Sequence, residues 1–433
     1  MKQRFERFIF IYLLAHLWCF KTFGEFQDSG ELRFETRKFK DDEVDRTIDN
    51  ATAIYTRAEM KYSKESYNAT FRGYALVDGK DETRDNLTIE DMFFSYYLKE
   101  DESASLSAGY KIFNWSATEA FHPADILNSQ NYDSNIESLD KIGELNLDTS
   151  FKTPYGNFSL LYLPYAQAPR YPKQRSRLGA SVNLSRPVWV TKKDETNLQN
   201  WHHQGAVKYS NSIGAGDLSL HAVYHLNTVN PIIGKRIVYE NILFFSLPVG
   251  IEFTPYYFRA LQLGGTYQYA LDGGWLIKTE AAYRDFLDDE VIIQTIKGNR
   301  SPQDHGIVAV GTEYGFSMKN GGESNIVLEF QTLMGPNKLA RSELSVFQND
   351  VMLGYRLALN DTFGKEFFVS LIRDIERQNE TLYNFNYTQR LNDNWKIKTG
   401  FRVYDAPKKG TYATGLEAYH NAHYVFFNLS RFF

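Results

Sequence analysis

The stretch Asn394-Trp-Lys-Ile-Lys-Thr-Gly-Phe-Arg-Val-Tyr404 alternates apolar and polar side chains along its whole length. One set of alternate positions carries Trp395, Ile397, Thr399, Phe401 and Val403, and the other carries Lys396, Lys398, Gly400 and Arg402. Successive side chains of a β-strand point to opposite faces. The pattern therefore predicts a strand with one apolar face and one charged face.

The same two-residue period recurs along the chain, whereas long helical periodicity does not occur. It predicts an all-β chain of about eighteen strands, with sixteen to twenty as the range. The strands are expected at residues 30–38, 50–62, 66–77, 86–98, 104–113, 143–152, 156–164, 201–211, 216–227, 256–271, 275–287, 306–318, 323–334, 349–360, 364–374, 380–390, 394–405 and 421–433. Residues 237–245 are an alternative strand, which would need a partner and would raise the number to twenty.

The connections between these segments alternate strictly along the chain. Every second connection has five residues or fewer, and those between them are mostly long. In an antiparallel meander, this alternation gathers the tight turns at one end, together with both termini. We expect one barrel domain over residues 25–433, with long exterior loops at 114–142, 165–200 and 228–255.

The composition indicates that the apolar strand faces meet lipid. The chain has 29 Tyr and 32 Phe, more than a soluble core of aliphatic side chains needs. Past the first two dozen residues there is no run of about 18 apolar residues, which excludes helical membrane spans. A soluble sandwich or propeller would not keep its long loops at one end. Because backbone groups in hydrocarbon need partners within the protein, we predict a closed transmembrane antiparallel up-and-down β-barrel.

The first 24 residues have the pattern of a secretory signal peptide. Lys2, Arg4 and Arg7 precede the apolar stretch 8–20, and small side chains follow it near Gly24. The apolar stretch is too short to span a membrane. Cleavage after Gly24 would change the net charge from −5 to −8 and would remove the single cysteine, so we expect no disulfide in the mature chain.

The chain ends in a phenylalanine on an alternating segment. Counting back in steps of two from the end gives an apolar face that only Arg431 interrupts: Phe433, Leu429, Phe427 and Val425. This ending resembles the assembly signal of Gram-negative outer-membrane proteins. The resemblance implies an outer-membrane location, contact with outer-membrane lipid and lipopolysaccharide, and recognition by the barrel-assembly machinery.

A narrower resemblance lies in Gly109-Tyr-Lys-Ile-Phe-Asn-Trp115, followed by Phe121-His-Pro-Ala-Asp-Ile-Leu-Asn128. It is similar to a segment of poorly characterised porin-like families, in which a strand ends near Trp and leads into an Asp-x-x-Asn loop. Those families often have Gly after the Trp, whereas this chain has Ser116. The resemblance implies a porin-like barrel and little about its substrate.

Two adjacent long loops carry opposite charge. Between 114 and 140 the charged residues are all acidic, namely Glu119, Asp125, Asp133, Glu137 and Asp140. Between 166 and 193 they are all basic, namely Arg170, Lys173, Arg175, Arg177, Arg186, Lys192 and Lys193. If both loops fold inward, they set a transverse field that favours polar solutes. The alternative is that both are solvated exterior surface.

These loops and the charged strand faces define a candidate solute path. Its residues are Glu119, Asp125, Asp133, Arg170, Lys173, Arg175, Arg177, Lys278, Glu280, Arg284, Arg356, Lys396, Lys398 and Arg402. The lumen-facing positions are biased towards positive charge, which favours anionic solutes weakly.

The histidines do not form a catalytic or metal-binding pattern. The segment 201–205 contains His202 and His203 without a neighbouring serine. His221 and His225 would lie about 13 Å apart along a strand, too far to bind one metal ion. We therefore expect no enzyme, no cofactor, no metal and no nucleic-acid partner, with a barrel hydrolase as the least favoured reading.

The predicted function is an outer-membrane, porin-like channel for passive diffusion of small polar or anionic solutes. The alternative is a non-conducting structural or surface-interaction barrel whose loops plug the lumen. The sequence leaves open whether the barrel is a monomer or a homo-oligomer.

Overall fold

The computed structural model describes most of the chain after the predicted signal peptide. The described residues are 25–41, 48–99, 101–179, 183–192, 195–242, 245–377, 380–407, 414–420 and 422–433. The predicted leader, residues 1–24, lies outside them.

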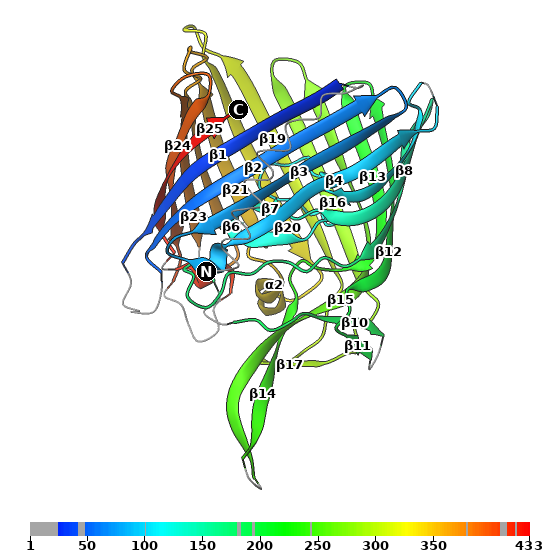
Figure 1. The fold of residues 1–433 in the computed structure, drawn as a ribbon, viewed down its shortest axis with the longest axis vertical. Coiled ribbons are helices and arrows are strands. Elements are labelled where there is room, and N and C mark those ends of the chain that lie inside the picture. The colour runs from blue at the N-terminus through cyan, green and yellow to red at the C-terminus, as the bar shows by residue number, and fades with distance from the viewer. Residues whose placement is uncertain are drawn as a thin grey trace.

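Eighteen antiparallel strands form a closed barrel (Figure 1). In chain order they are β1 (Glu25–Phe39), β2 (Asn50–Lys64), β3 (Tyr67–Asp78), β4 (Asn86–Tyr97), β5 (Ala104–Lys111), β8 (Glu144–Thr153), β9 (Gly156–Tyr165), β12 (Trp201–Ile213), β13 (Gly216–Leu226), β15 (Phe245–Leu271), β16 (Trp275–Phe286), β19 (His305–Ser317), β20 (Glu323–Met334), β21 (Asp350–Ala358), β22 (Glu366–Asp374), β23 (Thr381–Arg390), β24 (Trp395–Asp405) and β25 (Tyr424–Phe432). Each strand pairs with its neighbours in the barrel, and β1 pairs with β25 from Glu31↔Phe432 to Phe39↔Tyr424. The predicted fold class, an all-β up-and-down barrel of about eighteen strands, is confirmed.

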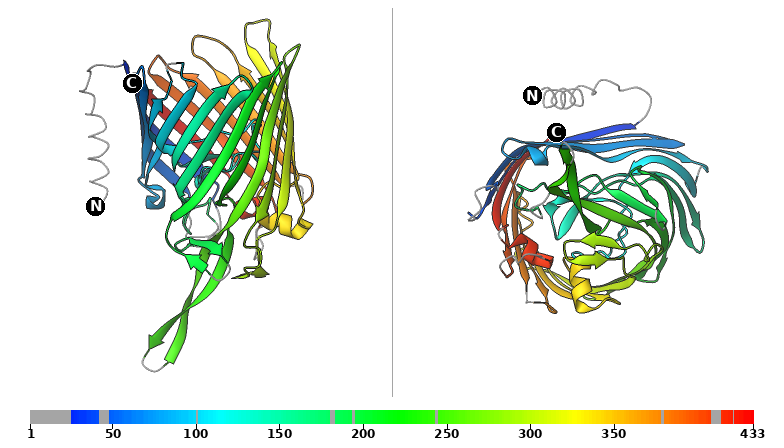
Figure 2. Two further views of the ribbon diagram at one scale, coloured as in Figure 1. Left: turned by 90° about the vertical axis from the view of Figure 1, so that its right-hand side faces the viewer. Right: turned by 90° about the horizontal axis from the view of Figure 1, so that it is seen from below.

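The short turns and the long connections lie at opposite ends of the barrel (Figure 2). Glu25, the first described residue, pairs with Ser63 beside the β2–β3 turn. Phe433 pairs with Gly30 at the same end. Both ends of the described chain thus lie with the short turns, as an even number of strands requires.

Side chains alternate between the outer face and the lumen along every wall strand. On β15 and β16 the outward-facing Leu263 and Tyr283 are about half exposed, whereas the inward-facing Gln262 and Glu280 are fully buried. The exterior is thus apolar and the interior is polar. This arrangement pairs the backbone groups within the closed sheet and leaves an apolar outer surface, which is the pattern of a barrel wall in hydrocarbon.

The barrel closes at a seam between a glycine and the terminal phenylalanine. The N–H of Gly30 donates to the carbonyl of Phe433 at 2.9 Å, and the N–H of Phe433 donates back at 3.1 Å. The Phe433 ring covers Gly30 so closely that a Cβ on this residue would overlap it. The Phe433 ring can keep this position only while residue 30 has no side chain.

Residues 228–255 contain a β-hairpin, where the sequence predicted a loop. β14 (Ile232–Ile242) pairs with the first part of β15, from Ile232↔Tyr256 to Ile242↔Phe245. β15 joins the wall only from Arg259 onwards, where it pairs with β13. The hairpin projects beyond the long-loop end as an arm (Figure 1). The two strands of the arm pair with each other, so neither of them joins the wall within the arm. The barrel therefore keeps eighteen strands and does not gain the two that the alternative required.

Several short elements lie at the long-loop end or inside the barrel. They are η1 (Glu82–Arg84), β6 (Gln130–Asn135), β7 (Ser138–Lys141), β10 (Val188–Lys192), β11 (Glu195–Asn197), β17 (Ile293–Thr295), β18 (Gly298–Arg300), α2 (Lys338–Leu344) and η2 (Gly415–Tyr419). Among the described residues, no helix is long and apolar enough to cross a membrane.

Candidate solute path

The connection between β5 and β8 folds into the barrel (Figure 2). It has two parts, the inner arm 114–124 and the β6–β7 hairpin. Both parts contact strands far from their own base: the inner arm reaches β16 and β20, and the hairpin reaches β24 and β25. This inserted loop narrows the lumen and brings acidic side chains into it.

Glu280 on β16 fixes the first part of the inner arm. Its carboxylate accepts hydrogen bonds from Ser116 Oγ at 2.7 Å, from Thr118 N at 2.8 Å and from Thr118 Oγ1 at 2.7 Å. The backbone N–H of Ala117 donates to the same oxygen. Glu280 is fully buried, so hydrogen bonds replace the water that its charge has lost.

A second glutamate of the wall binds the next two residues of the inner arm. Glu329 on β20 accepts hydrogen bonds from the backbone N–H groups of Glu119, at 2.6 Å, and Ala120, at 2.9 Å. Glu280 belongs to the predicted solute path, whereas Glu329 does not. Nothing in the local sequence indicates that these carboxylates bind the backbone of a loop more than 150 residues away.

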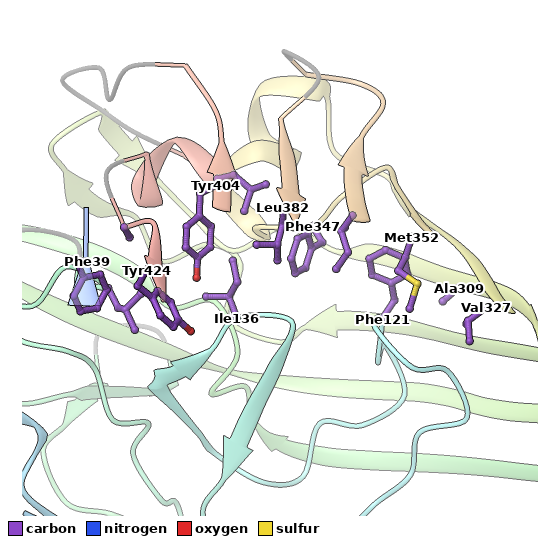
Figure 3. Close-up of a cluster of buried hydrophobic side chains, with 14 residues drawn as sticks. Phe39, Phe121, Ile136, Ala309, Val327, Phe347, Met352, Leu382, Tyr404 and Tyr424 are labelled. Carbon is purple, nitrogen blue, oxygen red and sulfur yellow. The ribbon is translucent and has the colours of Figure 1, made fainter. Parts of the chain in front are cut away.

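An apolar contact inside the barrel holds the inserted loop against the wall. Phe121 from the inner arm and Ile136 from the hairpin pack in one buried cluster with inward-facing residues of the wall (Figure 3). Met352 and Leu382 are among these wall residues and are almost fully buried. The lumen face is therefore apolar where the loop docks, although it is polar elsewhere.

The β6–β7 hairpin places its acids beside arginines. Arg84 forms ion pairs with Glu35 at 2.5 Å, with Asp78 at 2.6 Å and with Asp133 at 3.3 Å. Burial raises the pKa of Asp133, and the guanidinium of Arg84 opposes that shift. Burial lowers the pKa of Arg84, but the surrounding carboxylates, Glu35 foremost, outweigh it and raise the pKa overall. These ion pairs hold the β6–β7 hairpin against the β3–β4 connection.

Two more residues of the predicted solute path form ion pairs that hold the inserted loop in shape and in place. Arg402 on β24 is 2% exposed and pairs with Glu137 at 2.7 Å. Asp125 pairs with Lys141 within the inserted loop. Asp125 and Arg402 are thus neutralised by neighbours.

The acids of the inserted loop that remain open to the lumen are Glu119 and Asp140. The Glu119 side chain is 44% exposed and pairs with Lys278 at 3.1 Å. Lys278 also pairs with Glu313. Asp140 is exposed and lies within the electrostatic reach of Arg33 and Arg57.

A basic wall on β1–β3 faces the inside of the barrel. Arg57 pairs with Glu90 at 2.9 Å, and Arg72 pairs with Asp91 at 2.5 Å. The guanidinium of Arg33 lies 3.9 Å from the centre of the Tyr55 ring. These arginines are about one quarter to one third exposed. Acid and base therefore both line this part of the lumen.

The basic loop 165–200 runs along the long-loop end. The backbone of Arg170 pairs with that of Gln130 and Tyr132, and its guanidinium donates to Thr88 at 3.2 Å. Arg177 pairs with Asp49 at 3.1 Å, in the β1–β2 connection. These two arginines thus lie towards the β1–β4 rim, whereas Glu119 lies on the β16–β20 side.

The remaining residues of the predicted solute path lie in four different places. Lys173 and Arg175 are exposed on the basic loop. Arg284 is buried and donates to Gln262 at 2.8 Å. Arg356 pairs with Glu366 at 3.2 Å near a short turn. The inward-facing Lys396 and Lys398 on β24 are partly buried, and no carboxylate of the described chain forms an ion pair with either.

No group of three His, Cys, Asp or Glu side chains converges to hold a metal ion among the residues that the structure describes. The side chains of His221 and Gln262 lie within hydrogen-bonding distance, at 3.1 Å.

The architecture is similar to that of solved bacterial porins. The porin of Rh. blastica, in an engineered form with three substitutions, is 13% identical with a TM-score of 0.43; the match covers 94% of this chain and 100% of that chain. The Salmonella typhi OmpF structure with daunomycin is 9% identical with a TM-score of 0.46; it covers 95% of this chain and 98% of that chain. The described chain itself forms a closed, antiparallel β-barrel of eighteen strands. No protein-family model matches the chain, and no curated protein does.

Proposed function

We propose that this porin-like barrel is a channel in the outer membrane of a Gram-negative bacterium, through which small polar solutes diffuse passively. The observation that carries the proposal is the closed wall of eighteen strands with an apolar exterior and a charged interior. A wall of this size encloses an aqueous channel in known barrels, and its exterior suits hydrocarbon. Removal of residues 1–24 as a signal peptide is part of the proposal.

The lumen charges support a preference for polar solutes, and for anions among them. Glu119 and Asp140 face the lumen, and Arg33, Arg57 and Arg72 line β1–β3. Acid and base on facing surfaces produce a transverse field, which disfavours apolar solutes because they displace ordered water. The unpaired Lys396 and Lys398 add positive charge to the path.

The test is planar-bilayer recording with the purified mature chain. We expect discrete conductance steps in potassium chloride and a zero-current potential that indicates weak anion preference in a salt gradient. A barrel that inserts without any conductance step would contradict the proposal.

The second candidate is a non-conducting barrel plugged by its own loops. Phe121 and Ile136 favour it, because they pack the inserted loop against the inner wall, and Arg170 joins the basic loop to the inserted loop. The double variant Glu280→Gln, Glu329→Gln removes the charge from both acceptors that hold the inner arm. Glu366→Gln is the matched control, because Glu366 pairs with Arg356 and does not contact the loop.

These variants separate the two candidates. A silent native barrel that conducts after the double substitution, but not after Glu366→Gln, would establish the plug. A native barrel that conducts, and whose current becomes larger or noisier in the double variant, would establish the channel with an inserted constriction.

The same proposal includes the expected partners. Val425, Phe427 and Phe433 are exposed on the outer side of the last segment, and Leu429 is partly exposed. We assign this face to recognition by the barrel-assembly machinery, and the apolar exterior to outer-membrane lipid with lipopolysaccharide around it. Association into a homo-oligomer would show as a larger detergent-solubilised particle by light scattering.

A further inference from the structure

A polar cavity lies beneath the inner arm, on the β9–β15 side of the lumen. Its volume is about 280 Å³. Asn114, Trp115 and Ser116 line it from the inserted loop, and residues of β9, β12, β13 and β15 line it from the wall. The volume is just below the roughly 300 Å³ at which pockets for drug-sized ligands begin. It therefore suits a solute of monosaccharide size.

The cavity contains one cation without a carboxylate partner. Lys208 on β12 lines it, and no carboxylate of the described chain forms an ion pair with the Lys208 ammonium group. The ammonium lies 5.1 Å from the centre of the Trp115 ring. Trp115 is itself held against His221, at 5.1 Å between ring centroids, and by the attachment of Ser116 to Glu280. The Lys208 ammonium group is therefore held in place by the inserted loop, which lines one side of the cavity.

Most of the other side chains that line the cavity carry hydroxyl or amide groups that make no hydrogen bond within the described protein. In the described chain, seven lining hydroxyl and amide side chains make no hydrogen bond to protein: Asn114, Asn157, Ser210, Asn211, Ser219, Thr266 and Gln268. Hydroxyl and amide groups both donate and accept, so they match the hydroxyl groups of a solute. A site of this kind distinguishes a polyhydroxylated solute from an apolar one, because an apolar solute would leave these groups without partners.

The charge of the cavity limits the solute further. Asp217 also lines the cavity, and it accepts a hydrogen bond from Ser212 Oγ at 2.5 Å. The Lys208 ammonium group can pair with one negative charge on the solute, and Asp217 disfavours any further negative charge. We propose that this cavity is a binding subsite for polyhydroxylated monocarboxylates, with Lys208 as the partner of the carboxylate. The inference rests on the proposed channel function and names its solute class.

The binding test is calorimetry on the full mature chain in detergent. Gluconate is the probe, glucose lacks its charge, and acetate lacks its hydroxyl groups. We expect gluconate to bind at least about tenfold more tightly than either control. Lys208→Met should weaken gluconate binding by about tenfold or more. Lys208→Arg should retain binding, because arginine, like the native lysine, carries a positive charge at this position.

The matched control is Lys61→Met. Lys61 lies on β2, pairs with Glu59 at 2.9 Å and does not line the cavity. Gluconate affinity should not change in this variant. Heat-modifiable mobility in a denaturing gel checks that every variant forms the barrel. Acetate or glucose binding as tightly as gluconate, or an unchanged affinity in Lys208→Met, would overturn the inference.

Bilayer recording separates this inference from the channel proposal. Gluconate should reduce the open-channel current of the native chain and of Lys61→Met, but not that of Lys208→Met. Conductance steps together with calorimetry that detects no gluconate binding would overturn the subsite and leave the channel standing. Lys208-dependent binding by a barrel that never conducts would support the subsite and contradict the channel.

Discussion

At the scale of single residues, the face that a side chain occupies decides what a substitution costs. Leu263 is 53% exposed on the outer face of β15, whereas Thr266 faces the lumen. Leu263→Arg places a charge in hydrocarbon and should lower the free energy of unfolding by about 2–4 kcal/mol near the bilayer midplane. Thr266→Arg places the same charge in water and should leave that free energy nearly unchanged.

Urea titration of the barrel in liposomes, followed by tryptophan fluorescence, measures both variants of this pair. Equal destabilisation by the two arginines would mean that the assignment of faces on β15 is wrong.

The seam offers a second residue-scale prediction. Gly30→Val adds a side chain where the Phe433 ring already lies, so the ring must leave its present position. We expect the variant to unfold at lower temperature, measured by the temperature at which its gel mobility shifts. Gly250→Ala is the control, because a Cβ at position 250 meets open space. A Gly30→Val barrel as heat-resistant as this control would show that the Phe433 ring does not secure the seam.

At the scale of elements, the β14–β15 arm is separable from the wall. Its strands pair with each other, and β15 meets β13 and β16 only from Arg259 and Ala260 onwards. Replacing residues 236–252 by Asn-Gly, a sequence suited to a two-residue hairpin turn, should therefore leave barrel assembly and its heat resistance unchanged. Heat-modifiable gel mobility after refolding into detergent measures both. Failure of the shortened chain to form the barrel would show that the arm takes part in assembly.

The inserted loop illustrates an element that sequence could only partly predict. The opposite charges of the two long loops are visible in the sequence, but the tie between Ser116 and Glu280 joins residues 164 positions apart. Local patterning carries no information about such contacts. The strands could be predicted, because the alternating pattern that identifies each strand lies within about ten consecutive residues.

At the scale of the whole molecule, the net charge of the lumen should determine ion preference. Lys396 and Lys398 face inwards on β24 and form no ion pair with described residues. The double variant Lys396→Glu, Lys398→Glu should shift the zero-current potential towards cation preference, because it reverses two charges along the path. Lys235→Glu on the external arm is the control and should not shift it. An unchanged potential in the double variant would place β24 outside the current path.

The sequence by itself determined most of the strands, their faces, the range of sixteen to twenty for their number, and the end at which the turns gather. These follow from a local property, the alternation of side chains across a pleated sheet, repeated between short and long connections. Only the tertiary structure decided that the first long loop lies inside the wall, that Glu280 and Glu329 hold it, and that residues 232–256 form an arm. Those features depend on contacts between distant segments, which exist only once the barrel has closed.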